Sequence, residues 1–105
     1  MLTNNMRPIH PGEILREEYL IPLEMSANAL AIKLQIPATR ISAIVNEKRA
    51  ITVDTALRLA RFFGGDAQSW LNLQQAFDIK TIPAELEQEL NYIVPMPVSA
   101  SAVTA

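Results

Sequence analysis

Side chains that can read the edges of base pairs recur between residues 37 and 46. If this segment is a helix, its exposed face presents Thr39, Arg40, Ala43 and Asn46. In the major groove, arginine bonds guanine, asparagine bonds adenine, and small apolar groups contact the thymine methyl. We therefore expect these four residues to contact bases of duplex DNA. The alternative is an ordinary solvated helix face.

A second set of residues has the hydroxyl, amide or cationic groups that contact DNA phosphates. Two of them, Ser26 and Thr52, are also expected to cap helices whose N-terminal N–H groups would face phosphates. For each residue alone, an ordinary cap or surface charge is the alternative. Arg58 and Arg61 lie further along the chain, and we expect them to pair with carboxylates. The expected phosphate contacts are Ser26, Asn28, Ser42, Lys48, Arg49 and Thr52.

The chain is acidic overall but basic in its middle. Its 105 residues include nine Lys and Arg against eleven Asp and Glu, a net charge of −2. Residues 33–61 hold six basic side chains and two acidic ones, which leaves a local charge of +4. A local excess of positive charge is typical of a phosphate-binding surface. Charge alone equally fits an ordinary surface, so the argument depends on the residue pattern.

Two helices must position the base-reading face. Apolar residues at helical spacing predict one helix over 27–34 and another that runs through about Val45. A break at 35–37 separates them, because the residue before a proline avoids the α-helical region. Ala31 is small enough to let the two backbones approach, and isoleucines lock the helices together. This arrangement is a helix-turn-helix, in which Gln35 takes a turn position where glycine is common.

The flanking segments are also expected to be helical, which makes the fold all-α. Pro11 begins a first helix that Pro22 should end near Leu20. Thr52 caps a fourth helix that stops at Gly64-Gly65, with Val53 and Leu57 among its core positions.

The C-terminal third should hold two more helices. Asp66 caps the fifth, and Pro83 opens a short sixth one. The tail from Val94 is expected to be loose. An apolar cluster near the end needs burial by dimer packing, by a partner or by the chain's own domain. It consists of Leu86, Leu90, Tyr92, Ile93 and Val94.

Several stretches together resemble the HigA antitoxin family of the Xre/Cro-type helix-turn-helix group. The resemblance covers residues 8 to about 79, and departs from the family pattern at Gln35 and Glu47, where glycine is common. The stretches are His10–Leu15, Met25-Ser26, Asn46–Thr52, Asp54–Ala60 and Trp70–Gln74.

The resemblance implies a five-helix, lambda-repressor-like DNA-binding domain over 1–79, followed by a partly loose C-terminal extension over 80–105. It also implies a homodimer that binds operator DNA and represses its own operon. A further implied partner is a RelE-like ribonuclease toxin of the HigB type, which the antitoxin neutralises. Two alternatives are a stand-alone phage-type repressor without a toxin, and a protein-interaction module that has lost DNA binding.

Other function classes lack the residues they need. The chain has no cysteine and a single histidine, His10, which we expect to be a capping or surface group. No nucleophile, metal cluster or phosphate loop is present, so we expect no enzyme and no cofactor. No apolar run approaches the ~20 residues of a membrane span. The first ten residues lack the apolar core of a signal peptide, so a cytoplasmic protein without a membrane partner is expected.

Overall fold

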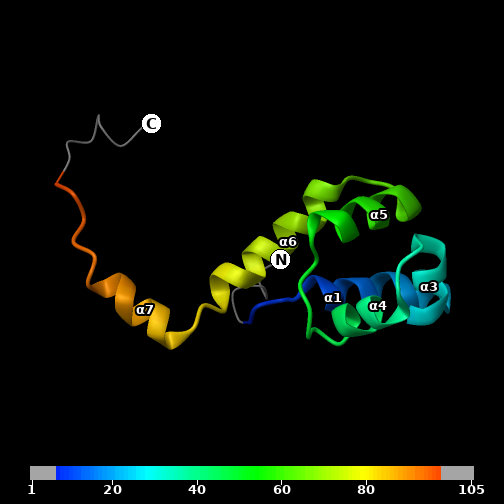
Figure 1. The fold of residues 1–105 in the computed structure, drawn as a ribbon, viewed down its shortest axis with the longest axis horizontal. Helices are drawn as coiled ribbons and strands as arrows, with labels where there is room; N and C mark the ends of the chain where they lie inside the picture. Colours follow the sequence, from blue (N-terminus) through cyan, green and yellow to red (C-terminus); the bar gives the residue numbers. More distant parts are fainter. Residues whose placement is uncertain (1–6, 98–105) are drawn as a thin grey trace.

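The computed structural model describes residues 7–97, and each regular element in this range is helical, as expected. Figure 1 shows a compact group of helices with one helix, α7, standing apart from it. The first helix is continuous but has three segments: α1 (Pro11–Ile14), η2 (Leu15–Leu20) and α2 (Ile21–Leu23).

The expectation that Pro22 ends the first helix near Leu20 is wrong. The segment η2 is a π-helix, in which N–H groups bond five residues back, and the N–H of Ile21 accordingly donates to the carbonyl of Arg16. Pro22 has no N–H to lose, and it enters the first turn of α2 directly after this wider turn. The helix ends instead at Glu24, whose φ of 53° is left-handed.

The predicted helix-turn-helix is present. The helix α3 (Ala27–Leu34) begins at Ser26, whose Oγ accepts from the N–H of Ala29 at 3.0 Å. It ends at Gln35, which has the expected positive φ of 61°. Pro37 then precedes α4 (Ala38–Val45) as its N-cap residue.

The next two helices also begin where their capping residues predict. The helix α5 (Val53–Phe63) begins after Thr52, and α6 (Ala67–Lys80) begins after Asp66. Gly64 ends α5 with a φ of 91°. The core positions expected for Val53 and Leu57 are wrong: these side chains are 59% and 57% exposed, because the helix turns them away from α3 and α6.

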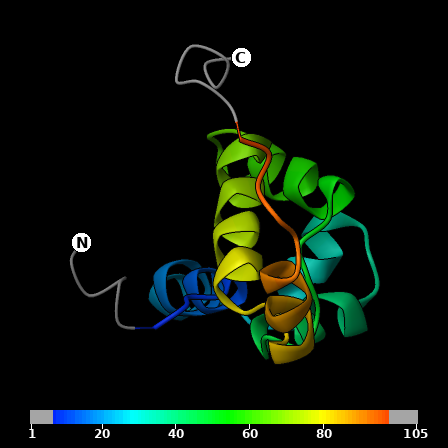
Figure 2. The ribbon, with the colours of Figure 1, turned by 90° about the vertical axis from the view of Figure 1, so that its left-hand side faces the viewer.

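The predicted sixth helix is α7 (Ala84–Asn91), and every residue in it is exposed. Figure 2 views the molecule from the end at which α7 lies. The apolar cluster around Leu86 and Leu90 therefore does not pack back on its own domain, which removes one of the three expected ways to bury it. Residues Val94–Pro97 are not helical, and the rest of the expected loose tail lies outside the described residues.

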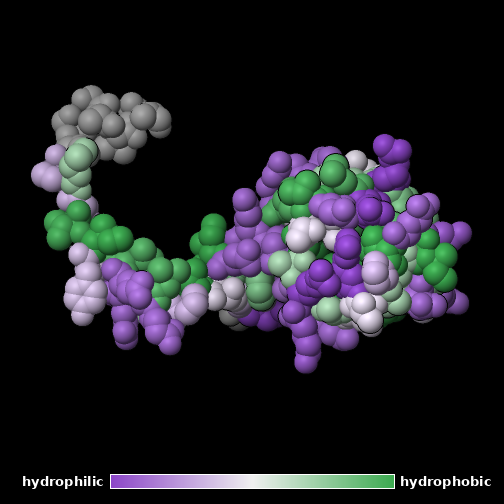
Figure 3. Space-filling model, in the orientation of Figure 1, coloured by the Kyte–Doolittle hydropathy of each residue, from purple (hydrophilic) through white to green (hydrophobic). Residues whose placement is uncertain are grey.

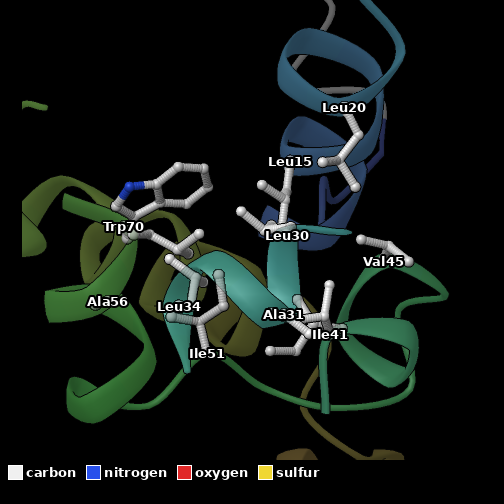
Figure 4. Close-up of a cluster of buried hydrophobic side chains, with 12 residues drawn as sticks. Leu15, Leu20, Leu30, Ala31, Leu34, Ile41, Val45, Ile51, Ala56 and Trp70 are labelled. Carbon is white, nitrogen blue, oxygen red and sulfur yellow. The ribbon is translucent and has the colours of Figure 1, made fainter. Parts of the chain in front are cut away.

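The core gathers apolar side chains from α1, η2, α3, α4, α5 and α6, while those of α2 are exposed (Figure 4). Trp70 of α6 is 5% exposed and lies 5.5 Å from the ring of Tyr19, which in turn lies 4.7 Å from Phe63. The buried apolar side chains are Leu15, Leu20, Leu30, Ala31, Leu34, Ile41, Ile44, Val45, Ile51, Ala56, Leu59 and Trp70.

The start of the first helix fits closely against α4. A Cβ added to Gly12 would lie 1.8 Å from the carbonyl oxygen of Ile44, so only glycine allows this approach. His10 caps the helix, because its Nδ1 accepts from the N–H of Gly12 at 2.8 Å. The cap expected for His10 is confirmed, but the residue is buried rather than on the surface. This packing fixes the C-terminal end of α4.

Candidate nucleic-acid interface

The helix α4 has one buried face and one open face. Its buried face consists of Ile41, Ile44 and Val45, as the periodicity predicts. On the open face, Arg40 and Ala43 are partly exposed. The other predicted contact residues of this face are exposed: Thr39, Ser42 and Asn46.

An acidic residue of the next helix reaches the open face of α4. Asp54 accepts from Nη1 of Arg40 at 3.0 Å and from Nε of Arg58 at 2.7 Å. The two guanidinium groups, chiefly that of Arg58, hold the pKa of the Asp54 carboxyl below its ordinary value. Arg40 is therefore oriented by an ion pair that stands at the protein surface, where such pairs are easily exchanged.

Arg58 also ties α5 to the end of α3. Its Nη1 donates to the carbonyl oxygen of Leu34 at 2.8 Å, one of the free carbonyls at the C-terminus of α3. The predicted pairing of Arg58 with a carboxylate is thus confirmed. The same prediction for Arg61 is wrong, because its side chain has no ion pair within residues 7–97.

The C-terminus of α4 is held by a residue that the sequence did not single out. Arg16 of η2 donates to the carbonyl oxygen of Val45 and forms an ion pair with Glu47 at 3.3 Å. A cation is favoured at a helix C-terminus, where carbonyl groups are free. Hydrogen bonds with Glu17 and Glu47 raise the pKa of Arg16. Glu47 itself has a φ of 62°, at the position where the resembled family often has glycine.

The predicted phosphate contacts divide into two kinds. The hydroxyls of Ser26 and Thr52 accept from N–H groups at their helix N-termini, at 3.0 and 3.4 Å. The others have exposed side chains without a hydrogen bond or ion pair to any other described residue: Asn28, Ser42, Lys48 and Arg49. The first group is occupied as caps, while the second is free to bind an anion.

The turn that contains Lys48 and Arg49 is held in place by a residue of α6. The Oε1 atom of Gln74, which is 6% exposed, accepts from the N–H of Ile51 at 2.8 Å. The amide nitrogen of Gln74 donates to Asp78 at 2.9 Å, so both polar atoms of this side chain have a partner. Only tertiary packing brings positions 51 and 74 together, and their spacing in the sequence gives no sign of the contact.

A two-helix unit with a buried locking face, an open polar face and basic residues beside it defines a helix-turn-helix DNA-binding protein. Comparison with known proteins agrees, because the family model described as helix-turn-helix matches residues 15–70. The chain belongs to this family and, within it, to the HigA-type antitoxins.

Relatives of this chain have been solved as HigA proteins. A HigA-family antidote protein of an addiction module from Coxiella burnetii is 52% identical, with a TM-score of 0.79 over 87% of this chain and 100% of the other. The antitoxin HigA of Pseudomonas aeruginosa, solved with the higBA promoter, is 42% identical, with a TM-score of 0.82 over the same shares.

A curated relative covers nearly the whole sequence. Virulence-associated protein I of Dichelobacter nodosus is 56% identical over 100 residues, which are 95% of this chain and 92% of the relative. The chain is a regulator rather than an enzyme, as the family assignment requires. In the part of the chain that the structure describes, no helix is long and apolar enough to cross a membrane, and no acidic, His or Cys group forms a metal site.

Proposed function

We propose that this chain binds the operator of its own operon through α4, represses that operon as a homodimer, and neutralises a RelE-like ribonuclease toxin of the HigB type. The observation that carries the proposal is the open face of α4, which is rigidly mounted and free of acidic side chains of its own. The relative from Pseudomonas aeruginosa, which was solved with a promoter, supports the DNA-binding part.

The base contacts in this proposal are Thr39, Arg40, Ala43 and Asn46. For Arg40 to reach a guanine, it has to exchange its ion pair with Asp54 for base acceptors. Asp54 remains bonded to Arg58 in that event, so no charge is left without a partner. The proposed phosphate contacts are Ser26, Asn28, Ser42, Lys48, Arg49 and Thr52.

In this proposal, residues 1–79 form the DNA-binding unit and residues 80–105 an extension available to partners. Two copies would place their α4 helices about 34 Å apart, which matches half-sites one helical turn apart. Operator binding would place the protein in the bacterial cytoplasm.

The DNA-binding part is tested by titrating the chain against its own promoter and against a scrambled duplex of equal length. We expect tighter binding to the promoter by about 10³-fold or more, and a steep loss of affinity with salt. Equal affinity for both duplexes would overturn sequence-specific binding. Failure to bind either duplex would favour the alternative of a protein-interaction module that has lost DNA binding.

The toxin part is tested by co-purification with the product of the neighbouring gene, with and without promoter DNA. We expect a stable complex and loss of the neighbour's ribonuclease activity in it. Specific promoter binding by a chain that leaves the neighbour's product unbound would instead indicate a stand-alone repressor.

A further inference from the structure

Two arginines from different helices share one carboxylate oxygen beside the open face of α4. The Oδ1 atom of Asp54 accepts from Nη1 of Arg40 at 3.0 Å and from Nε of Arg58 at 2.7 Å. Figure 3 shows hydrophilic side chains over α4 and α5 on the visible face of the compact group. Because a carboxylate oxygen accepts more than one hydrogen bond, either arginine can keep Asp54 paired when the other leaves.

The two arginines are held unequally. Nη1 of Arg58 also donates to the carbonyl oxygen of Leu34 at 2.8 Å and to that of Gln35 at 3.5 Å. The side chain of Arg40, by contrast, has no partner other than Asp54 among the described residues. Arg58 is therefore fixed to the end of α3, and Arg40 is the partner that can leave the carboxylate.

The carboxylate also interacts more strongly with the fixed arginine. The pKa of Asp54 lies below its ordinary value, and the hydrogen bond from Arg58 is the largest cause, ahead of that from Arg40. Asp54 and Arg58 lie four positions apart on α5, so the helix itself keeps them together. This pair does not depend on α4, and it persists when Arg40 turns toward a base.

The cost of releasing Arg40 therefore depends on Arg58. With Arg58 in place, the departure of Arg40 leaves the Asp54 carboxylate paired. Without Arg58, Asp54 would have Arg40 as its single cationic partner, and the departure of Arg40 would leave a bare carboxylate near the DNA phosphates, which repel it.

We propose that Arg58 is a positioning residue for operator recognition, which holds the Asp54 carboxylate so that Arg40 is released to a base edge. Arg58 itself contacts no base and acts through Asp54. The inference rests on the proposed function, in which Arg40 is a base contact. Arg58 should accordingly favour the promoter only while both Arg40 and Asp54 are present.

The test measures the affinity of the full chain for its promoter and for a scrambled duplex by fluorescence anisotropy. Arg58→Gln should weaken binding to the promoter about fivefold more than binding to the scrambled duplex, because Asp54 then retains Arg40. The matched control is Arg61→Gln, which removes the same charge from α5 at an exposed position without an ion pair to any described residue. The control should weaken binding to both duplexes equally.

A second change separates the release of Arg40 from a merely structural role of Arg58. Adding Asp54→Asn to Arg58→Gln should restore most of the promoter affinity, because no carboxylate then retains Arg40. The double variant has the net charge of the wild type, so general attraction to DNA is matched. The bond from Arg58 to the Leu34 carbonyl is absent from both variants, and a defect caused by its loss would not be relieved. Circular dichroism measures the stability of each variant.

The dependence on Arg40 is tested in an Arg40→Ala background. There, Arg58→Gln should affect promoter binding no more than Arg61→Gln does, because the side chain that Arg58 releases is absent. Such non-additivity is the signature of two residues that act through one contact.

The outcomes distinguish this inference from the proposed function on which it rests. If Arg58→Gln behaves as Arg61→Gln does in the wild-type background, or if Asp54→Asn does not relieve its defect, the positioning role is overturned and the base contact of Arg40 stands. A promoter preference that survives Arg40→Ala would overturn both.

Discussion

At the residue scale, one carboxylate is paired with the arginine that we propose as the main base contact. Asp54 pairs with Arg40 at 3.0 Å and with Arg58 at 2.7 Å, so its negative charge lies beside the proposed DNA surface. The ion pair joins Arg40 to the first turn of α5 in the free protein, and the carboxylate also opposes the approach of phosphates.

Replacing Asp54 separates these two effects. We expect Asp54→Asn to tighten binding to any duplex and to steepen the salt dependence by about one unit, because one more cation is free to displace counterions. Discrimination between promoter and scrambled DNA should fall. Fluorescence anisotropy at several salt concentrations measures the affinity for promoter and scrambled DNA and its salt dependence. Glu18→Gln, at an exposed position, is the control. Weaker binding to every duplex would contradict this account.

We expect His10 to make the stability of the domain depend on pH below about 6.5. Burial lowers the pKa of His10 below its ordinary 6.5, against the opposing charges of Glu47 and Asp78. The unfolded chain therefore binds a proton more readily than the folded chain between the lowered pKa and 6.5. Stability is complete above that range and falls as the pH drops through about 6.5.

Urea unfolding of wild type and His10→Asn between about pH 5.5 and 7.5 measures this dependence. Asparagine also caps helix N-termini but does not titrate, so the slope should disappear in the variant. The carboxyls whose pKa values are lowered, such as Glu13 and Asp54, lose their contributions only at more acidic pH. Equal slopes for both proteins would show that His10 is not the titrating group.

At the element scale, the position of α4 depends on contacts at its buried face and C-terminus. Gly12 approaches the Ile44 carbonyl, and Arg16 donates to the carbonyl of Val45. The first helix therefore contacts the C-terminal end of α4 and leaves its open face uncovered. The turn after α4 is fixed separately by Gln74 of α6. These contacts leave the open face of α4 free while restricting its movement.

We expect Gly12→Ala to lower the free energy of unfolding by about 1–3 kcal/mol, because its Cβ would force two backbones apart. Thermal unfolding followed by circular dichroism measures the loss, with Glu18→Ala in the same helix as the control. Promoter affinity should also fall, since α4 is displaced. A variant as stable as wild type would show that the close approach is not needed.

Most helix boundaries are predictable from the sequence, because capping residues and prolines act on their immediate neighbours. Ser26, Thr52 and Asp66 cap the helices they were expected to cap, and the break before Pro37 falls where proline chemistry demands. The end of the first helix was not predictable, because the π turn before Pro22 admits the proline. Periodicity also could not show that Val53 and Leu57 face outward, because the apolar pattern does not reveal which face of α5 packs against the other helices.

The contacts that complete the candidate site join residues far apart in the chain. Arg16 meets Val45 across 29 positions, and Gln74 meets Ile51 across 23. Such pairs follow from tertiary packing, and neither spacing nor residue type marks them in advance. The predicted contact residues of α4 needed only helical periodicity, which is why their shared face could be placed from the sequence.

At the scale of the whole molecule, binding surfaces lie on separate parts of an elongated chain. The proposed DNA-binding face belongs to the compact group of helices, while α7, whose apolar side chains are exposed, stands apart from that group (Figure 1). An overall charge of −2 is compatible with DNA binding because the positive charge concentrates in residues 33–61, while residues 1–32 and 62–105 carry the acidic excess.

In the proposed function, α4 reads the operator, with Arg40 as its main base contact. The most direct measurement compares the affinity of Arg40→Ala for the promoter and for a scrambled duplex, with surface Arg7→Ala as the matched control. We predict that Arg40→Ala loses most of the preference for the promoter, at least about 1–3 kcal/mol, while its thermal stability and scrambled-DNA affinity change little. An unchanged preference for the promoter would contradict the account.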